Sequence, residues 1–193
     1  MTLKFVLAAV AAVVALAAPA RAADNPVVVV ETSLGSFEVE LFADKAPKTV
    51  ENFLGYVDDK FYDGLIFHRV ISDFMIQGGG FEPGMKQKKT KDQIKNESDN
   101  GLKNDRGTLA MARTAAADSA TSQFFVNVKD NNFLNKGDKD AVSPDGYCVF
   151  AKVVKGMDVV DKIKEVKVKD LPEGHKKVPI EDVVIKSITR KKK

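Results

Sequence analysis

Short runs of apolar residues, some continuous and some alternating with polar residues, recur along most of this chain. The first such pattern is 27–42, VVVVETSLGSFEVELF, in which two runs rich in β-branched and aromatic residues flank Ser33-Leu34-Gly35. Runs of this kind around a glycine-containing turn are typical of a β-hairpin. We therefore predict that two antiparallel strands occupy 27–42.

Further apolar or alternating segments predict additional strands after this hairpin. They are 65–71, 74–77, 108–112, 124–128, 148–154 and 183–189. Two other segments have apolar residues at helical spacing and predict amphipathic helices: Pro47–Asp58, with a proline in its first turn, and Met157–Lys164, after Gly156. The polar stretches 82–106 and 135–145 are predicted to be loops.

The arrangement of these segments indicates a fold class. Strands that are short and joined by polar loops favour an antiparallel barrel over an α/β sheet, in which a helix would follow each strand. We predict a mostly β domain with two capping helices, whose last strand lies beside the first. No repeat or flexible linker divides the chain, so 23–193 is predicted to be one domain with a short basic C-terminal tail.

The first 22 residues have a different character from the rest. A single positive charge lies in Met1–Lys4, an uninterrupted apolar run spans 5–18, and Ala20-Arg21-Ala22 has the small-x-small pattern that signal peptidase accepts. The apolar run is shorter than the roughly 20 residues needed to cross a bilayer. We predict that 1–22 is a cleaved secretory signal peptide, and that no stable membrane association remains after cleavage.

Charge argues against a nucleic-acid partner. Cleavage after Ala22 removes two basic residues, Lys4 and Arg21, and no acid, which lowers the net charge from +3 to +1. A nucleic-acid binder needs a concentrated basic surface, and the only strong basic runs are 86–91 and 190–193. Contact of these two runs with nucleic acid or a membrane is a weaker alternative, because both are typical of a solvated loop and tail.

Several classes of enzyme chemistry lack their residues. The only histidines are His68 and His175 and the only cysteine is Cys148, which excludes a zinc site of several His and Cys ligands and an intramolecular disulfide. Gly78-Gly79-Gly80 lacks the lysine and following helix of a phosphate-binding loop. We expect no metal and no cofactor, and we predict that Cys148 is a buried strand residue.

The segment around Arg69 carries the best candidate for a binding surface. Because side chains alternate along a strand, Met75 and Gln77 share one face while Ile76 points inward. An exposed patch of Phe74, Met75 and Gln77 around an arginine is typical of a ligand surface. His68 lies on the opposite strand face from Arg69, so we predict a structural histidine with satisfied hydrogen bonds.

These motifs together resemble the cyclophilin family. The signature is FHRVISDFMIQGGGF at 67–81, followed by MAR at 111–113 and ATSQFFVN at 120–127. Similarity extends to APKTVENF in the first predicted helix, KNE at 95–97, FLN at 133–135 and VFAKVVKGMDVVDKI at 149–163. Loop lengths resemble those of the bacterial periplasmic branch. The predicted signal peptide implies export, so we predict a periplasmic location.

The resemblance implies a fold, an activity and a set of site residues. The fold would be a closed eight-stranded antiparallel β-barrel capped by two α-helices, and the activity peptidyl-prolyl cis/trans isomerisation. Its partners would be proline-containing unfolded or nascent exported polypeptides, bound by a monomer. The implied catalytic residues are Arg69, Phe74 and Gln77, and the implied substrate-binding residues are Met75, Ala112, Arg113, Gln123, Phe125, Phe133, Leu134 and Tyr147.

Within that set, the resemblance implies distinct roles. Phe74, Met75, Phe125 and Leu134 would form the proline pocket, and Gln77, Ala112, Arg113 and Gln123 would hold the peptide backbone on either side of the proline.

Three positions depart from the usual family pattern. Phe133 replaces a common tryptophan that hydrogen-bonds and packs against cyclosporin, so we predict weak binding of that drug. Tyr147 replaces a common histidine. Arg113 replaces the asparagine of many eukaryotic members, which predicts a different preference around the peptide backbone.

The implied reaction suits an arginine. Rotation about a peptide bond has a barrier of roughly 18–20 kcal/mol, and in the twisted state the prolyl nitrogen regains a lone pair that a permanent cation can hydrogen-bond. The alternative from another class is a binding module, in which the same groove holds proline-containing segments without turnover.

Overall fold

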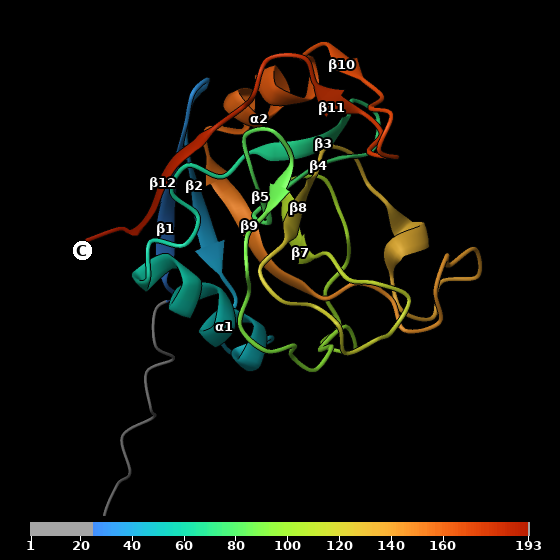
Figure 1. Ribbon diagram of the computed structural model, residues 1–193. Helices are drawn as coiled ribbons and strands as arrows, with labels where there is room; N and C mark the ends of the chain where they lie inside the picture. Colours follow the sequence, from blue (N-terminus) through green and yellow to red (C-terminus); the bar gives the residue numbers. More distant parts are fainter. Residues whose placement is uncertain (1–24, 193) are drawn as a thin grey trace, which may run out of the picture.

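A curled antiparallel sheet of eight strands forms the centre of the computed structural model, which describes residues 25–192 (Figure 1). The strand order is β12-β1-β2-β9-β7-β8-β4-β3. The bounds are β1 Val27–Thr32, β2 Gly35–Leu41, β3 Phe67–Ile71, β4 Met75–Gly78, β7 Thr108–Met111, β8 Phe124–Asn127, β9 Val149–Lys155 and β12 Ile185–Arg190. The predicted signal peptide lies outside the described residues.

Both predicted helices are present with the predicted bounds, α1 at Pro47–Asp58 and α2 at Met157–Lys164. They lie at opposite ends of the curled sheet (Figure 1). The opening hairpin is also confirmed, because β1 pairs with β2 from Val27↔Glu40 to Thr32↔Gly35. Its turn is stabilised by the hydroxyl of Thr32, which donates to the carbonyl of Gly35 and accepts from the N–H of Leu34.

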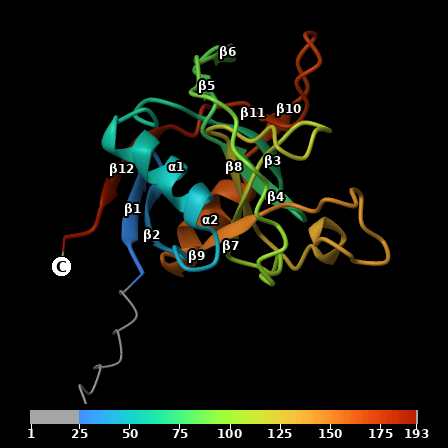
Figure 2. The same ribbon diagram turned by 90° about the horizontal axis from the view of Figure 1, so that it is seen from below.

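Two short hairpins and one helical turn were not predicted. β5 (Phe81–Glu82) pairs with β6 (Lys86–Gln87), and β10 (Val168–Lys169) pairs with β11 (Val178–Pro179). The turn is a 3₁₀ helix, η1, at Asn132–Leu134. Each hairpin strand has two residues, too few for alternation to be seen in the sequence. Both hairpins project beyond the main sheet in Figure 2.

The barrel is a half-barrel, and the predicted closed form is too strong a description. The sheet ends at β12 and β3, and these edges meet only at the start of each strand, at the bridge Ile66↔Val184 and through neighbouring backbone hydrogen bonds of Ile185 with Gly64 and Leu65 and of Phe67 with Val183. Farther along β3, the N–H of Val70 donates to the carbonyl of Lys177 in the excursion between α2 and β12. Because that excursion occupies the edge of β3, β12 cannot pair with β3 along the whole strand.

The core lies inside the curl of the sheet. Phe53 of α1 is completely buried and its ring lies 5.3 Å from Tyr62, 5.7 Å from Phe124 and 5.2 Å from Phe150, measured between centroids. These aromatic contacts join α1 to β8 and β9, two strands that are distant from it in the sequence. They fix the helix across one end of the sheet.

The N-terminus of α1 is capped from a distant segment. Ala46 precedes the helix and offers no side-chain cap, but the carboxylate of Glu97 accepts hydrogen bonds from the N–H groups of Lys48 and Thr49 at 3.2 and 2.8 Å. The hydroxyl of Thr49 donates to the same carboxylate at 2.7 Å. Unpaired N–H groups and the helix dipole both favour an anion at this position.

Glu97→Ala should therefore lower the free energy of unfolding by about 1–2 kcal/mol. Urea denaturation at neutral pH measures the change. Glu51→Ala is the matched control, because Glu51 is an exposed carboxylate on the same helix. Equal losses in the two variants would show that the Glu97 carboxylate does not cap the helix.

Candidate functional site

The two faces of β4 belong to different apolar clusters. Ile76 lies in the interior core, whereas Met75 packs on the outer face with Ala110, Phe125 and Leu134. The predicted alternation along β4 is therefore confirmed. The outer cluster covers β4, β7 and β8, and it forms the floor of a cavity of about 330 Å³ on the surface of the sheet.

The cavity brings together the predicted site residues with one exception. Gln123 lines a neighbouring cavity instead, where its side-chain carbonyl accepts a hydrogen bond from Gln77 at 3.0 Å. Val142 is a lining residue that the sequence did not predict, because it lies in a polar loop without periodicity. The lining residues are Arg69, Phe74, Met75, Gln77, Ala112, Arg113, Phe125, Phe133, Leu134, Val142 and Tyr147.

The floor of the cavity is deeply buried, whereas the sequence predicted an exposed patch that included Met75. Met75 is 1% exposed, and Phe125 and Leu134 are each 4% exposed. Phe74 and Phe133 face each other at the rim, with ring centroids 5.5 Å apart. The groove therefore offers a preformed apolar floor, and polar groups of Arg69, Gln77 and Arg113 line the same cavity.

Arg69 supplies a cation at the edge of this floor. One terminal nitrogen of its guanidinium donates to the side-chain carbonyl of Gln77 at 3.4 Å, and its central carbon lies 5.9 Å from the ring centre of Phe74. Burial lowers the pKa of Arg69 from its ordinary value, and interaction with Tyr147 partly opposes this effect. No ion pair within 25–192 includes Arg69. Its remaining N–H groups can therefore bind a ligand.

The guanidinium of Arg113 is held by two loops. Its Nε–H and one Nη2–H donate to the carbonyl of Gly146 at 3.0 and 2.8 Å, and Nη2 also donates to the hydroxyl of Ser143 at 2.7 Å. Nη1 donates to the carbonyls of Thr114 and Ala115 at 3.0 and 3.5 Å. All five N–H donors are thus used within the protein. The side chain cannot also hold a peptide backbone without breaking these bonds.

Arg113 also lies over Tyr147, with its central guanidinium carbon 4.6 Å from the ring centre. The same ring also lies near Phe125 on the floor, at a centroid distance of 5.9 Å. Tyr147 is therefore packed between the arginine and the floor, and the three side chains form one wall of the cavity.

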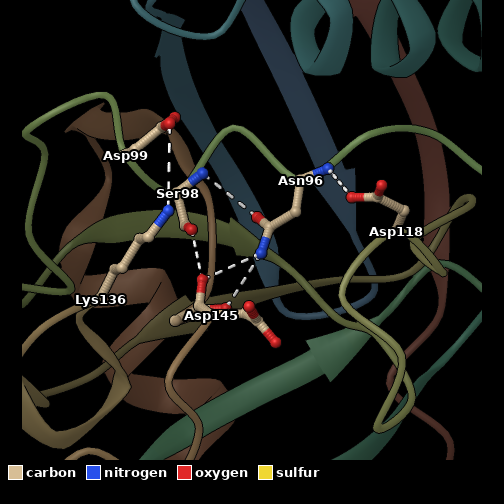
Figure 3. A network of polar contacts seen from close by, with 7 residues as sticks. Asn96, Ser98, Asp99, Asp118, Lys136 and Asp145 are labelled. Carbon is tan, nitrogen blue, oxygen red and sulfur yellow. Dashed lines mark hydrogen bonds and ion pairs between the residues drawn. The ribbon is translucent and has the colours of Figure 1, made fainter.

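A polar network holds the loop that leads into Tyr147, and Figure 3 shows its side chains around Asn96 and Asp145. The side-chain amide of Asn96 donates to the carbonyls of Asp145 and Gly146 at 3.0 and 3.3 Å, and the hydroxyl of Ser98 also donates to the carbonyl of Asp145. The N–H of Asn96 donates to Asp118 at 2.8 Å. In the sequence, KNE at 95–97 indicates only the family pattern, which predicts no role for Asn96 or Ser98.

His68 packs as a structural residue, but it is not satisfied. It is 6% exposed, and its ring lies 4.5 Å from the ring of Phe81. The prediction that it lies on the opposite strand face from Arg69 is wrong, because a β-bulge between Phe67 and Arg69 interrupts the alternation along β3. Phe67 and Val70 both enter the interior core, and His68 lines a surface cavity together with Arg69. Its Nδ1 is buried and has no hydrogen-bond partner, so the prediction of a satisfied histidine is wrong in that respect. Burial, followed by the charges of His175 and Arg69, lowers the pKa of His68 from 6.5 to about 4.

This burial predicts a loss of stability in acid. Unfolding returns the pKa of His68 to about 6.5, so between about pH 4 and 6.5 the unfolded chain binds a proton that the folded chain does not. The neutral imidazole costs no stability above pH 6.5, and the free energy of unfolding falls as the pH decreases toward 4, by at most about 3 kcal/mol.

Urea denaturation at several pH values between 4.5 and 7.5 measures this dependence. His68→Gln should have a shallower slope than the wild type, and the difference between the two slopes removes the contribution of every other titrating group. Parallel slopes in the two proteins would contradict the assignment to His68.

Two other kinds of chemistry considered from the sequence concern a reactive cysteine and a metal site. Cys148 is buried as predicted, but it lies one residue before β9 and not within a strand. Burial raises the pKa of its thiol to about 11, which keeps it protonated and unreactive. Within 25–192, no group of three or more His, Cys, Asp or Glu side chains is placed to hold a metal ion. In the same part of the chain, no helix has the length and apolar character needed to span a membrane.

Comparisons with known proteins agree on one family. The family model described as cyclophilin type peptidyl-prolyl cis-trans isomerase/CLD matches residues 27–190. Peptidyl-prolyl cis-trans isomerase B of Escherichia coli (strain K12) is 61% identical over 158 residues, which are 82% of this chain and 95% of that protein. Peptidyl-prolyl cis-trans isomerase A of Dickeya dadantii (strain 3937) is 52% identical over 187 residues, 95% of this chain and 96% of that protein.

Solved structures give the same result. A crystal structure of a cyclophilin-type isomerase of Cryptosporidium parvum superposes with a TM-score of 0.73 at 28% sequence identity, covering 88% of this chain and 99% of that one. A second structure of the protein, determined in the presence of the dipeptide Ala-Pro, gives a TM-score of 0.72 at the same identity and covers 86% of this chain.

Proposed function

Because this chain belongs to the cyclophilin-type peptidyl-prolyl cis-trans isomerases and is an enzyme of that class, we propose that it accelerates X-Pro isomerisation in exported proteins as they fold. In this proposal Arg69 stabilises the twisted amide while the proline ring lies in the apolar groove. The observation that carries it is the guanidinium of Arg69, which has no ion-pair partner within 25–192 and lies beside a buried apolar floor.

The chemistry follows from what the groove can do to a peptide bond. A twisted amide has a pyramidal prolyl nitrogen with a lone pair, and Arg69 can donate to that lone pair in the transition state but not in the planar ground state. The floor formed by Met75, Phe125 and Leu134 binds the ring and excludes water. Gln77 is placed to hold the peptide on one side of the bond while the other side rotates.

The choice of a proline-containing ligand is supported by a relative. The Cryptosporidium parvum protein with the same fold has been crystallised in the presence of Ala-Pro. A proline ring is also of a size and polarity that suit the floor of the cavity. We infer that short X-Pro segments of unfolded polypeptides are the substrates and that the isomerase acts as a monomer.

The part of the proposal that concerns export depends on the first 22 residues. Their charged start, apolar run and small-x-small site are typical of a signal peptide, and on this basis we propose that the mature enzyme acts in the periplasm of its host. Mass spectrometry of the protein recovered from the periplasmic fraction should find Ala23 as the first residue. A chain that retains residues 1–22 in the cytoplasm would overturn this part.

Some side chains of each basic run form ion pairs within the protein. Lys91 forms an ion pair with Asp59, Arg190 with Asp58 and Lys191 with Glu38. This internal pairing supports the proposal that the protein has no nucleic-acid partner.

The activity is tested by a protease-coupled assay of X-Pro isomerisation with the mature wild-type protein. Acceleration that increases in proportion to enzyme concentration is expected. The alternative, a module that only holds proline-containing segments, predicts that the peptides bind without any acceleration, and that outcome would overturn the proposed mechanism.

A further inference from the structure

The charged side chains that line the substrate groove all have the same sign. The main cavity contains two charged side chains, Arg69 and Arg113. The neighbouring cavity, of about 320 Å³, shares Gln77, Ala112 and Arg113 with it and is otherwise lined by uncharged side chains, chiefly amides and hydroxyls. Arg113 therefore lies at the boundary of the two cavities and is the only charged residue that lines the second.

The charge of Arg113 is not neutralised by the protein. All of its hydrogen-bond acceptors are uncharged: the carbonyls of Thr114, Ala115 and Gly146 and the hydroxyl of Ser143. Acidic residues occur on the adjacent loops, but no ion pair among the described residues includes Arg113. A full positive charge therefore remains at the edge of the groove.

The position of this charge is also fixed. Five hydrogen bonds and the ring of Tyr147 hold the guanidinium in one place, so little side-chain entropy is lost when a ligand approaches it. For an exposed lysine or arginine, the attraction to an anionic ligand is weakened by the entropy lost on ordering the side chain and by screening from water. A fixed, half-buried cation beside an apolar floor is less affected by both.

We propose that Arg113 is a specificity-determining residue that favours substrates with an acidic side chain next to the proline. A peptide whose proline lies in the main cavity passes Arg113 where it enters the second cavity. A carboxylate there is attracted, and a lysine is repelled. Because the N–H donors of Arg113 are already used, the attraction is Coulombic. This inference rests on the proposed function of the same groove.

The test uses peptides that differ only in one residue beside the proline, which is Glu, Gln or Lys. One set carries this residue before the proline, and a second set carries it after the proline. Dissociation constants are measured by calorimetry with the mature protein, and kcat/KM by the isomerisation assay. At low ionic strength the Glu peptide of at least one placement should bind about fivefold tighter than the Gln peptide, and the Lys peptide should bind more weakly than both. The preference should shrink at about 1 M salt.

Two substitutions separate the charge from the hydrogen bonds. Arg113→Gln removes the charge and should bring the Glu-to-Gln ratio of dissociation constants close to one. Arg113→Lys keeps the charge but not the five donors, and should retain a preference for Glu. Lys162→Gln is the control for total charge, because Lys162 is an exposed residue of α2 outside both cavities, and its ratio should equal that of the wild type.

Each outcome decides one of the two proposals. Equal binding of Glu, Gln and Lys peptides by the wild type would overturn the role of Arg113, as would an unchanged Glu-to-Gln ratio in Arg113→Gln. Peptides that bind with the expected ratio but are not isomerised would overturn the proposed function and leave the selectivity confirmed.

Discussion

Arg69→Ala should lower kcat/KM for X-Pro isomerisation by about tenfold to a hundredfold. A hydrogen bond to a charged group contributes about 1.5–3 kcal/mol, and each 1.36 kcal/mol corresponds to a factor of ten in rate. The bond from Arg69 forms only when the amide twists, so its loss should appear in kcat more than in the affinity for the substrate. The apolar groove should still provide the remaining acceleration.

The protease-coupled assay measures this change, and Arg69→Lys is the matched control for charge. Lysine keeps a cation at the position but presents one ammonium on a flexible stem in place of a planar guanidinium, so its rate should lie between those of the wild type and the alanine variant. Unfolding curves of all three proteins should be similar, because Arg69 is half-buried and makes one 3.4 Å side-chain hydrogen bond. A fully active, folded Arg69→Ala enzyme would exclude the proposed mechanism.

Phe53→Ala should cause the largest loss of stability, about 3–5 kcal/mol in the free energy of unfolding. The side chain is completely buried and contacts the rings of Tyr62, Phe124 and Phe150, so its removal leaves a cavity that these rigid neighbours cannot fill. Domains of this size are typically stable by about 5–15 kcal/mol, so the variant should be close to unfolding at physiological temperature.

Urea denaturation followed by circular dichroism measures this loss. Phe53→Leu should lose much less stability, because leucine fills most of the volume. Phe133→Ala is the matched control at a half-buried ring, since Phe133 lies at the rim of the groove and outside the interior core. Comparable losses in Phe53→Ala and Phe133→Ala would contradict the assignment of Phe53 to the centre of the core.

Much of the fold could be predicted because the strands and helices have strong local patterns. The bounds of the main strands agree with the predicted segments to within two residues, and those of both helices agree fully. The hairpins β5–β6 and β10–β11 could not be predicted, because pairs of two residues have no periodicity. Whether β12 and β3 pair depends on where the segment between α2 and β12 lies. The sequence therefore did not indicate that the barrel is open between these two strands.

The candidate site was predicted through a resemblance, and the structure defined how its parts lie. The family motifs selected the residues that line the cavity apart from Val142, which lies in a loop without a pattern. They also assigned Arg113 to the peptide backbone. The five hydrogen bonds that occupy its guanidinium depend on the conformation of two loops and cannot be derived from a motif.

The sequence alone determined the strand and helix pattern, the alternation that places Met75 and Ile76 on opposite faces, and the motif that contains Arg69, because these are properties of neighbouring residues. Tertiary structure decided which distant groups meet. Glu97 caps a helix 48 positions earlier in the chain, His68 is buried without a partner for Nδ1, and Asn96 holds the loop that carries Tyr147. Such contacts depend on how loops pack after the sheet has formed, and local sequence does not encode that packing.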